Sequence, residues 1–244
     1  MGTIVLCELK KVKPKWWQLL LISFVLYQVG GMFLGISLDS ADKLFTWVQL
    51  GLFSYTYLAA TNILAAVVIL NEFTNKAATT TFTYKQERWK IYIGKIITIF
   101  IISLMIYAII FCFMLIISFI SFRSTLTLEV IVKHLVLTLK AYGYQMLMVT
   151  GTASIALVCK NYVAPIIYIG IQLFFSFLYL NSFAMRPYVP FSLPVVNNLM
   201  LIKDQYRILK GLAVQPSQVA IAVILFIGGL ALGLIYTNKM EVEK

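Results

Sequence analysis

The chain alternates between long apolar stretches and short segments in which charged residues gather. Runs without any charged residue extend over 16–38, 44–71, 96–122, 141–159, 161–185 and 211–238. Each is close to or above the roughly 20 residues that an α-helix needs to cross about 30 Å of hydrocarbon, and none shows the short alternating segments of a membrane barrel. The pattern therefore predicts an all-α integral membrane protein, a single domain over 1–244 with spans at about 16–37, 46–70, 95–121, 137–159, 163–181 and 217–237.

The composition agrees with a membrane protein. Of the 244 residues, 61% are hydrophobic and 12% are charged, and the mean hydropathy is +0.91, outside the range of soluble domains. The net charge of +11 also occurs in nucleic-acid-binding proteins. Here the basic residues flank the apolar runs, which is typical of contact with anionic lipid headgroups. We therefore expect membrane lipids, and not nucleic acid, as a partner.

The distribution of lysine and arginine predicts the orientation in the membrane. The N-terminal segment, the second and fourth connections and the C-terminus together hold twelve of these residues, against seven in the other connections. Lys140 is set aside because it falls inside the fourth predicted span. Since positively charged loops stay in the cytoplasm, we expect both termini and the connection between spans two and three to be cytoplasmic.

Two pairs of glycines four residues apart occur inside the predicted spans, Gly31 with Gly35 and Gly229 with Gly233. Glycines at this spacing permit two helices to approach closely. The sequence leaves two interpretations open, packing between helices of one chain and contact between two copies.

The connection between spans two and three, residues 71–95, is the longest and most charged on the predicted cytoplasmic side. Phe73, Ala77 and Tyr84 recur at helical spacing and give a short helix an apolar stripe. Trp89 and its basic neighbours then indicate an interfacial elbow before span three. One interpretation is that this segment only lies on the headgroups, and the other is that it docks on a partner.

Several residues of this connection resemble a known family. A Glu-Phe pair leaves span two, a small Thr- and Ala-rich helix follows, and an arginine precedes a Gly-Lys pair that opens span three. This order is similar to the cytoplasmic segment of type-2 ABC transporter permeases, and the bacterial permeases that export drugs or antimicrobial peptides, including lantibiotic immunity subunits, look most similar. The matching positions are Glu72, Phe73, Ala77, Thr79, Arg88, Gly94 and Lys95.

The resemblance implies a permease of six transmembrane helices in the bacterial plasma membrane, powered by a separate cytoplasmic ABC ATPase. The chain itself has no GxxxxGK[ST] phosphate-binding loop, so ATP and magnesium would belong to the partner and this subunit would be neither an enzyme nor a cofactor or metal protein. A second permease copy or a related permease would complete the membrane domain. The short helix between spans two and three would be the coupling helix, and the residues expected to couple it to the ATPase are Glu72, Phe73, Lys76, Ala77, Thr80 and Arg88.

The last outer connection, 181–215, contains three prolines and a long apolar part. Proline prevents one continuous helix there, and non-helical backbone at membrane depth is tolerated only inside protein or beside a cavity. The resemblance implies a re-entrant or interfacial segment at this place. A surface loop on the headgroups is the alternative.

Polar side chains within the predicted spans are candidates for a substrate path. Asn62, Gln28, Gln145 and Gln172 each need a hydrogen-bond partner in the membrane, from a neighbouring helix, a water-filled cavity or a ligand. Asn62, Gln145 and Lys140 form our candidate substrate path. His134, the only histidine, has no cysteine or carboxylate cluster in the sequence around it, so we do not expect a metal site.

Two function classes remain. One is a permease that moves a hydrophobic or amphipathic substrate, an antimicrobial peptide or a drug, out of the cell at the expense of ATP. The other is a non-transport membrane scaffold, immunity or sensor subunit that contacts lipid through its basic loop. A secondary transporter is disfavoured, because the sequence shows neither inverted repeats nor many acidic residues within the spans.

Overall fold

The computed structural model describes residues 2–11, 39–74, 87–178, 188–202 and 212–239. Within these ranges every regular element is helical and no strand is present. The first predicted span, 16–37, lies outside the described residues. The elements are α1 (Gly2–Lys11), α3 (Ala41–Val48), the π-helix η1 (Gln49–Thr56), α4 (Tyr57–Thr74), α6 (Arg88–Ser121), α7 (Leu128–Cys159), α8 (Val163–Leu178), the 3₁₀ turn η3 (Pro190–Ser192), α9 (Leu193–Leu199) and α10 (Pro216–Lys239).

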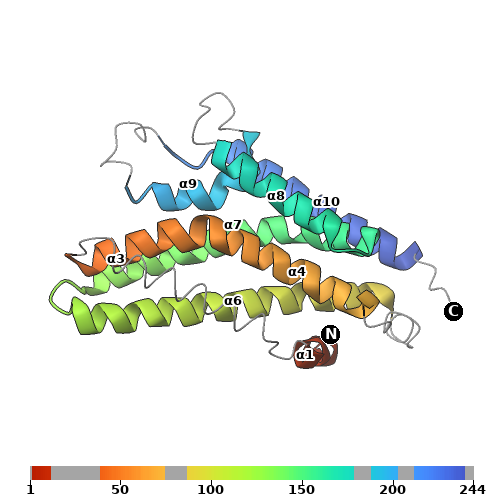
Figure 1. Cartoon of the computed structure of the whole chain (residues 1–244), viewed down its shortest axis with the longest axis horizontal. Helices are drawn as coiled ribbons and strands as arrows, with labels where there is room; N and C mark the ends of the chain where they lie inside the picture. Colours follow the sequence, from red (N-terminus) through yellow and green to blue (C-terminus); the bar gives the residue numbers. More distant parts are fainter. Residues whose placement is uncertain (1, 12–38, 75–86, 179–187, 203–211, 240–244) are drawn as a thin grey trace.

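The helices form an elongated bundle around α7. Figure 1 shows α3, η1 and α4 following one another along the bundle, with α6 on one side and α8, α9 and α10 on the other. Helix α7 contacts α4, α6, α8, α9 and α10. The short helix α1 lies against the end of the bundle where α6 begins (Figure 1). We call this the α1 end, and we call the opposite end, where α3 and α9 lie, the α9 end.

Among the described residues, three helices are long and apolar enough to cross a membrane, over Ala41–Phe73, Arg88–Ser121 and Pro216–Lys239. A shorter apolar helix covers Val163–Phe177. The prediction of an all-helical membrane protein is therefore confirmed for the described part of the chain. The count of six spans, their orientation and the single domain over 1–244 stay predictions.

Helix α7 is long enough to span a membrane but is more polar than the other long helices. Gln145, Thr150 and Thr152 in its middle are fully buried. Each makes a hydrogen bond to a neighbouring element of the bundle. For example, Thr150 Oγ1 donates to the backbone carbonyl of Phe226 in α10 at 2.9 Å. A central helix is surrounded by protein and not by lipid, so its polar groups find partners that a peripheral helix lacks.

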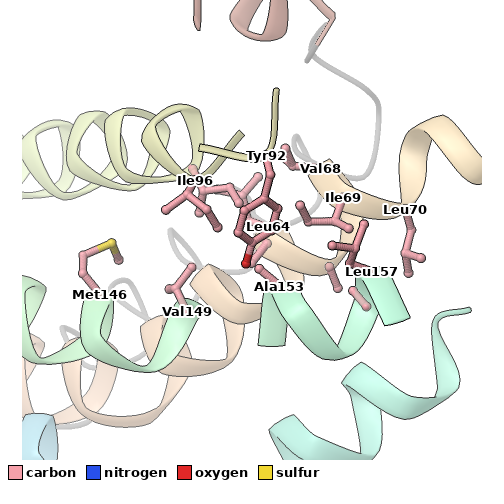
Figure 2. Close-up of a cluster of buried hydrophobic side chains, with 14 residues drawn as sticks. Leu64, Val68, Ile69, Leu70, Tyr92, Ile96, Met146, Val149, Ala153 and Leu157 are labelled. Carbon is pink, nitrogen blue, oxygen red and sulfur yellow. The ribbon is translucent and has the colours of Figure 1, made fainter. Parts of the chain in front are cut away.

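The main apolar core lies where α4, α6 and α7 meet. Figure 2 shows Tyr92 of α6 pointing between Leu64 of α4 and Ala153 of α7. Leu64, Tyr92 and Ala153 are each at most 5% exposed. A second core of buried aliphatic and aromatic side chains joins α3 and η1 to the other half of α6. The two cores together hold α6 along most of its length.

The glycine pair in α10 packs within the chain. A Cβ built on Gly229 would lie 2.7 Å from the backbone nitrogen of Gly151 in α7, and one on Gly233 would lie 2.1 Å from the Tyr92 ring in α6. Neither position has room for a larger side chain. Of the two interpretations left open by the sequence, the structure therefore supports intramolecular packing for Gly229 and Gly233, while Gly31 and Gly35 lie outside the described residues.

Candidate functional site

Four charged side chains form a closed ring of ion pairs at the α1 end. The Lys95 ammonium of α6 lies 2.7 Å from Glu8 Oε2 of α1 and 2.8 Å from Glu72 Oε1 of α4. The Lys11 ammonium lies 2.7 Å from Glu8 Oε1 and 3.0 Å from Glu72 Oε1. Each lysine therefore bridges both glutamates. We call Glu8, Lys11, Glu72 and Lys95 the charge cluster.

The charge cluster is mostly removed from solvent. The side chains of Glu8, Glu72 and Lys95 are 5%, 6% and 3% exposed, whereas Lys11 is 45% exposed. Burying a charge is tolerated only when a partner of opposite sign and hydrogen bonds compensate it. The two positive and two negative charges balance, so removal of one member would leave a buried charge without compensation.

The electrostatic effect of the cluster is visible in the pKa values of its α1 members. Burial alone would raise the pKa of Glu8, but Lys95 and Lys11 outweigh this and hold it below its ordinary value of 4.5. Burial would likewise lower the pKa of Lys11, but Glu8 and Glu72 raise it above its ordinary value of 10.5. Both groups are therefore charged at neutral pH, and the ion pairs stabilise the docked position of α1.

A glycine lets α1 approach α6 closely enough for these pairs to form. A Cβ built on Gly94 would lie 2.7 Å from Cγ2 of Ile4. On α1, Val5 and Glu8 are the buried residues, one turn apart on the same helix face. The two residues of the Gly94-Lys95 pair thus have different roles. Gly94 leaves room for α1, and Lys95 forms an ion pair with Glu8 of α1.

The cluster also joins the two ends of the segment 75–86. Glu72 lies near the end of α4, just before this segment, and Lys95 lies in the second turn of α6, shortly after it. The second carboxylate oxygen of Glu72, Oε2, is buried without a hydrogen-bond partner in the described part of the chain. The next residue, Phe73, has the Lys160 ammonium 5.9 Å from its ring centroid, which brings the α7–α8 turn to the same place.

The structure describes three of the six expected coupling residues. Glu72 is in the charge cluster, Phe73 is half-buried against the main core, and Arg88 is the half-buried first residue of α6. Lys76, Ala77 and Thr80 lie outside the described residues, as does Thr79 of the family pattern. Their coupling role stays a prediction, as does that of the three described residues.

The candidate substrate-path residues do not form one group. Asn62 is fully buried, donates to the carbonyl of Leu58 at 2.7 Å and accepts from Thr152 Oγ1 at 2.5 Å. Gln145, also fully buried, donates to the carbonyl of Phe53 at 2.6 Å and accepts from Tyr107 at 2.5 Å. Lys140 is exposed on α7. The two amides thus bond to neighbouring elements, and no contact joins them to Lys140.

A second polar network occupies the α9 end. The two ring nitrogens of His134 lie 3.0 Å from Asp42 Oδ1 and 2.8 Å from Gln49 Oε1. The Gln49 amide nitrogen donates to the carbonyl of His134 at 3.0 Å, and Asn198 of α9 donates to the Gln49 carbonyl at 3.0 Å. This network ties α3, η1, α7 and α9 together. Extended π-helical segments such as η1 are uncommon and are frequent at functional sites.

The sequence did not single out Glu8 or the His134 network. Glu8 stands three residues before Lys11, a spacing that indicates only a local ion pair on a helix. Two signals pointed to Glu72 and Lys95, since both fall at the ends of apolar runs and both match the family pattern. The partner of His134 could not be found from its local sequence, because Asp42 lies 92 positions earlier in the chain.

Comparison with known families agrees with this architecture. The family described as ABC-2 family transporter protein matches residues 4–179, from within α1 to the end of α8, and so includes all four members of the charge cluster. Because this match covers more than half of the chain, the chain belongs to the ABC-2 transporter family. No curated protein and no solved structure matches it.

Family membership defines the general role. The chain is a membrane-embedded permease of an ABC transporter, a component that associates with an ABC ATPase. Such permeases are typically the non-enzymatic transmembrane component. The resemblance noted from Glu72, Phe73 and the Gly94-Lys95 pair is therefore confirmed at the level of the family.

Proposed function

We propose that this permease exports a hydrophobic or amphipathic substrate, an antimicrobial peptide or a drug, using ATP hydrolysed by a separate cytoplasmic subunit. The connection between spans two and three contains the coupling helix, around Phe73 to Thr83, that docks on this ATPase. Both termini and the α1 end then face the cytoplasm, and the α9 end faces outward. ATP and magnesium bind to the ATPase, and this chain contributes no cofactor site.

The observation that supports this proposal most directly is the Glu72–Lys95 ion pair beside the coupling segment. Any displacement of the segment reaches α4 and α6 together, because these two buried side chains are 2.8 Å apart and each also pairs with α1, Glu72 with Lys11 and Lys95 with Glu8. Helices α3, η1 and α4 then extend from this point to the network around Gln49. A single helical path therefore connects the ATPase side to the α9 end, as coupling between distant sites requires.

Assembly and substrate contact complete the proposal. Two copies, or one copy with a related permease, form the membrane domain, and the substrate passes along Asn62, Gln145 and Lys140. The Asn62 and Gln145 amides have partners in the structure. A passing substrate can bind these amides only by breaking their existing hydrogen bonds. This favours transient contact over tight binding.

The test replaces Ala77 by glutamate in the coupling segment. An unpaired charge in a packed interface costs several kcal/mol, so Ala77→Glu should abolish co-purification of the ATPase in mild detergent and the resistance or export that the transporter provides in cells. The matched control is Ala213→Glu, because Ala213 is exposed in the loop before α10. Both variants should reach the membrane at normal levels, since neither residue lies within a predicted span.

The possible results separate the two function classes. Loss of ATPase binding by Ala77→Glu alone supports the coupling assignment. If the Ala77 variant keeps both ATPase binding and export at normal membrane levels, the segment does not dock on the ATPase. Lipid contact would then be the better account of this basic loop.

A further inference from the structure

One buried amide in the described part of the chain has no hydrogen-bond partner on either of its polar atoms. Gln172 lies in the middle of α8 and is fully buried, yet neither Oε1 nor Nε2 makes a hydrogen bond with any described residue. The Tyr168 hydroxyl is close enough to interact with it electrostatically, but the pair does not reach hydrogen-bond geometry. Buried polar groups are nearly always paired, so this exception needs an explanation.

Two other buried amides in the same bundle show that this fold can satisfy such groups. Asn62 and Gln145 each use both ends of the amide, with partners on a neighbouring helix and on backbone carbonyls. Gln172 has the same chemistry and the same degree of burial as these residues. Its amide therefore stands apart in having a donor and an acceptor that are both unused.

Phe191 of η3 contacts α8 on both sides of Gln172, and we call it the cover. The Tyr168 ring packs edge-on against the Phe191 ring of η3, with centroids 6.2 Å apart. The Ser176 hydroxyl lies 2.8 Å from the Phe191 carbonyl oxygen. Tyr168 and Ser176 are four residues before and after Gln172 on the same helix face, so Phe191 bridges the turns on both sides of the amide.

This cover packs against two small apolar clusters, and a few hydrogen bonds join η3 to α8 and α10. The Ser176 hydroxyl donates to two backbone carbonyls, that of Phe191 and that of Gln172. From α10, Gln218 Nε2 donates to the Val189 carbonyl at 3.2 Å. The opposite face of α8 is exposed and apolar, including Ile171 and Phe174. Movement of η3 away from α8 would therefore uncover an amide in an apolar surrounding.

We propose that Gln172 is a substrate-binding residue for peptides, occluded by Phe191 in the described conformation. This inference rests on the proposed export function and adds a substrate contact to it. A free carboxamide offers one C=O acceptor and N–H donors side by side, which is complementary to a peptide bond with its own N–H and C=O. A peptide that reaches the site can satisfy both atoms, whereas a hydrocarbon chain cannot.

The first measurement is the thermal unfolding midpoint of the full-length permease in complex with its ATPase. Replacing an unpaired amide by an apolar side chain of similar size removes a desolvation penalty, so Gln172→Leu should keep or raise the midpoint. The matched control is Gln145→Leu, which leaves the Phe53 carbonyl and the Tyr107 hydroxyl without partners. That variant should lower the midpoint.

The second measurement uses a synthetic amphipathic peptide of lysine and leucine and its backbone N-methylated analogue as probes. The reconstituted complex is titrated with each, and the concentration giving half-maximal ATPase stimulation is recorded. We expect Gln172→Leu to raise this concentration about tenfold for the normal peptide, the loss of one hydrogen-bonded pair. For the wild type, the N-methylated peptide should require a similarly higher half-maximal concentration than the normal peptide. For Gln172→Leu, the two peptides should give the same half-maximal concentration.

A variant of the cover provides an independent readout. Phe191→Ala should lower the half-maximal peptide concentration when Gln172 is present and leave it unchanged in the Gln172→Leu background. Additive effects of N-methylation and Gln172→Leu, a stability loss equal to that of Gln145→Leu, or a wild type that does not respond to the peptide would each overturn the inference. Co-purification of the ATPase with all variants would show that the ATPase docking on which the proposed export function depends stands even then.

Discussion

The Lys95 ammonium lies 2.7 Å from Glu8 Oε2 although 87 residues separate them in the chain. This ion pair fixes an N-terminal helix to the beginning of α6, beside the segment that we assign to ATPase docking. Because the same lysine also binds Glu72, the position of α1 is linked to that of α4. A movement of the coupling segment must therefore either carry α1 with it or break buried ion pairs.

The first prediction concerns removal of the central lysine. Lys95→Met leaves Glu8 and Glu72 buried with only the partly exposed Lys11 as a shared partner. Breaking a buried pair in this way costs about 3 to 5 kcal/mol, so the thermal unfolding midpoint in detergent should fall markedly. The control is Lys90→Met, whose ion pair with Glu87 is solvent-exposed and should contribute nothing measurable. Equal midpoints for the two variants would contradict the buried character of the cluster.

The second prediction is a dependence on acid pH that involves Glu8. Its pKa is lowered below the ordinary value of 4.5 in the folded chain. The stability from its ion pairs is therefore complete above pH 4.5 and is lost as the pH falls through the lowered pKa. Because the pKa of Lys11 is raised, the stability from the Lys11 ion pairs is lost only at pH values above 10.5. Unfolding midpoints measured from pH 3 to 7 should fall more steeply for the wild type than for Glu8→Gln, and parallel curves would exclude this role of Glu8.

The third prediction concerns the glycine that admits α1. A methyl group at Gly94 would press on Ile4 at 2.7 Å, and overpacking of this kind costs roughly 1 to 3 kcal/mol. Gly94→Ala should therefore displace α1 and speed trypsin cleavage after Lys10 and Lys11. Gly143→Ala is the control, because a Cβ there meets no atom within 4 Å, and its cleavage rate should match that of the wild type.

Local patterns in the sequence predicted the helices but not the contacts between them. The apolar runs indicated a helix over 46–70 and another over 95–121, and α4 and α6 lie there. The same runs gave no sign that Lys95 pairs with Glu8 or that His134 meets Asp42, because periodicity reports which residues share a helix face and not which distant helix lies opposite. The family resemblance pointed to Glu72 and Lys95 but did not predict that they pair with each other and with α1.

The π-helix η1 is the clearest feature that no periodicity could predict. It lies within a span whose residues 44–71 are uncharged and read as one regular helix. The Gln49 carbonyl at its start accepts a hydrogen bond from Asn198, a residue 149 positions further along the chain. A local sequence pattern has no information on such a partner. The same reason explains why Gln172 and Gln145 look alike in the sequence although only Gln145 is bonded in the structure.

The last prediction tests whether α9 maintains η1. Asn198 is fully buried and donates to the Gln49 carbonyl at 3.0 Å and to Ser54 Oγ at 3.1 Å. Asn198→Leu keeps the volume but removes both hydrogen bonds from α9 to η1, at a cost of roughly 1 to 3 kcal/mol, and hydrogen exchange of the amides in η1 should accelerate. Asn197→Leu is the control, because Asn197 bonds to the Leu137 carbonyl of α7 and to Asn198, with no hydrogen bond to η1. It should destabilise the packing of α9 on α7 with a smaller effect on exchange in η1. If the two variants change exchange in η1 equally, the π-helix depends on the general position of α9, and the specific hydrogen bond from Asn198 is not what maintains it.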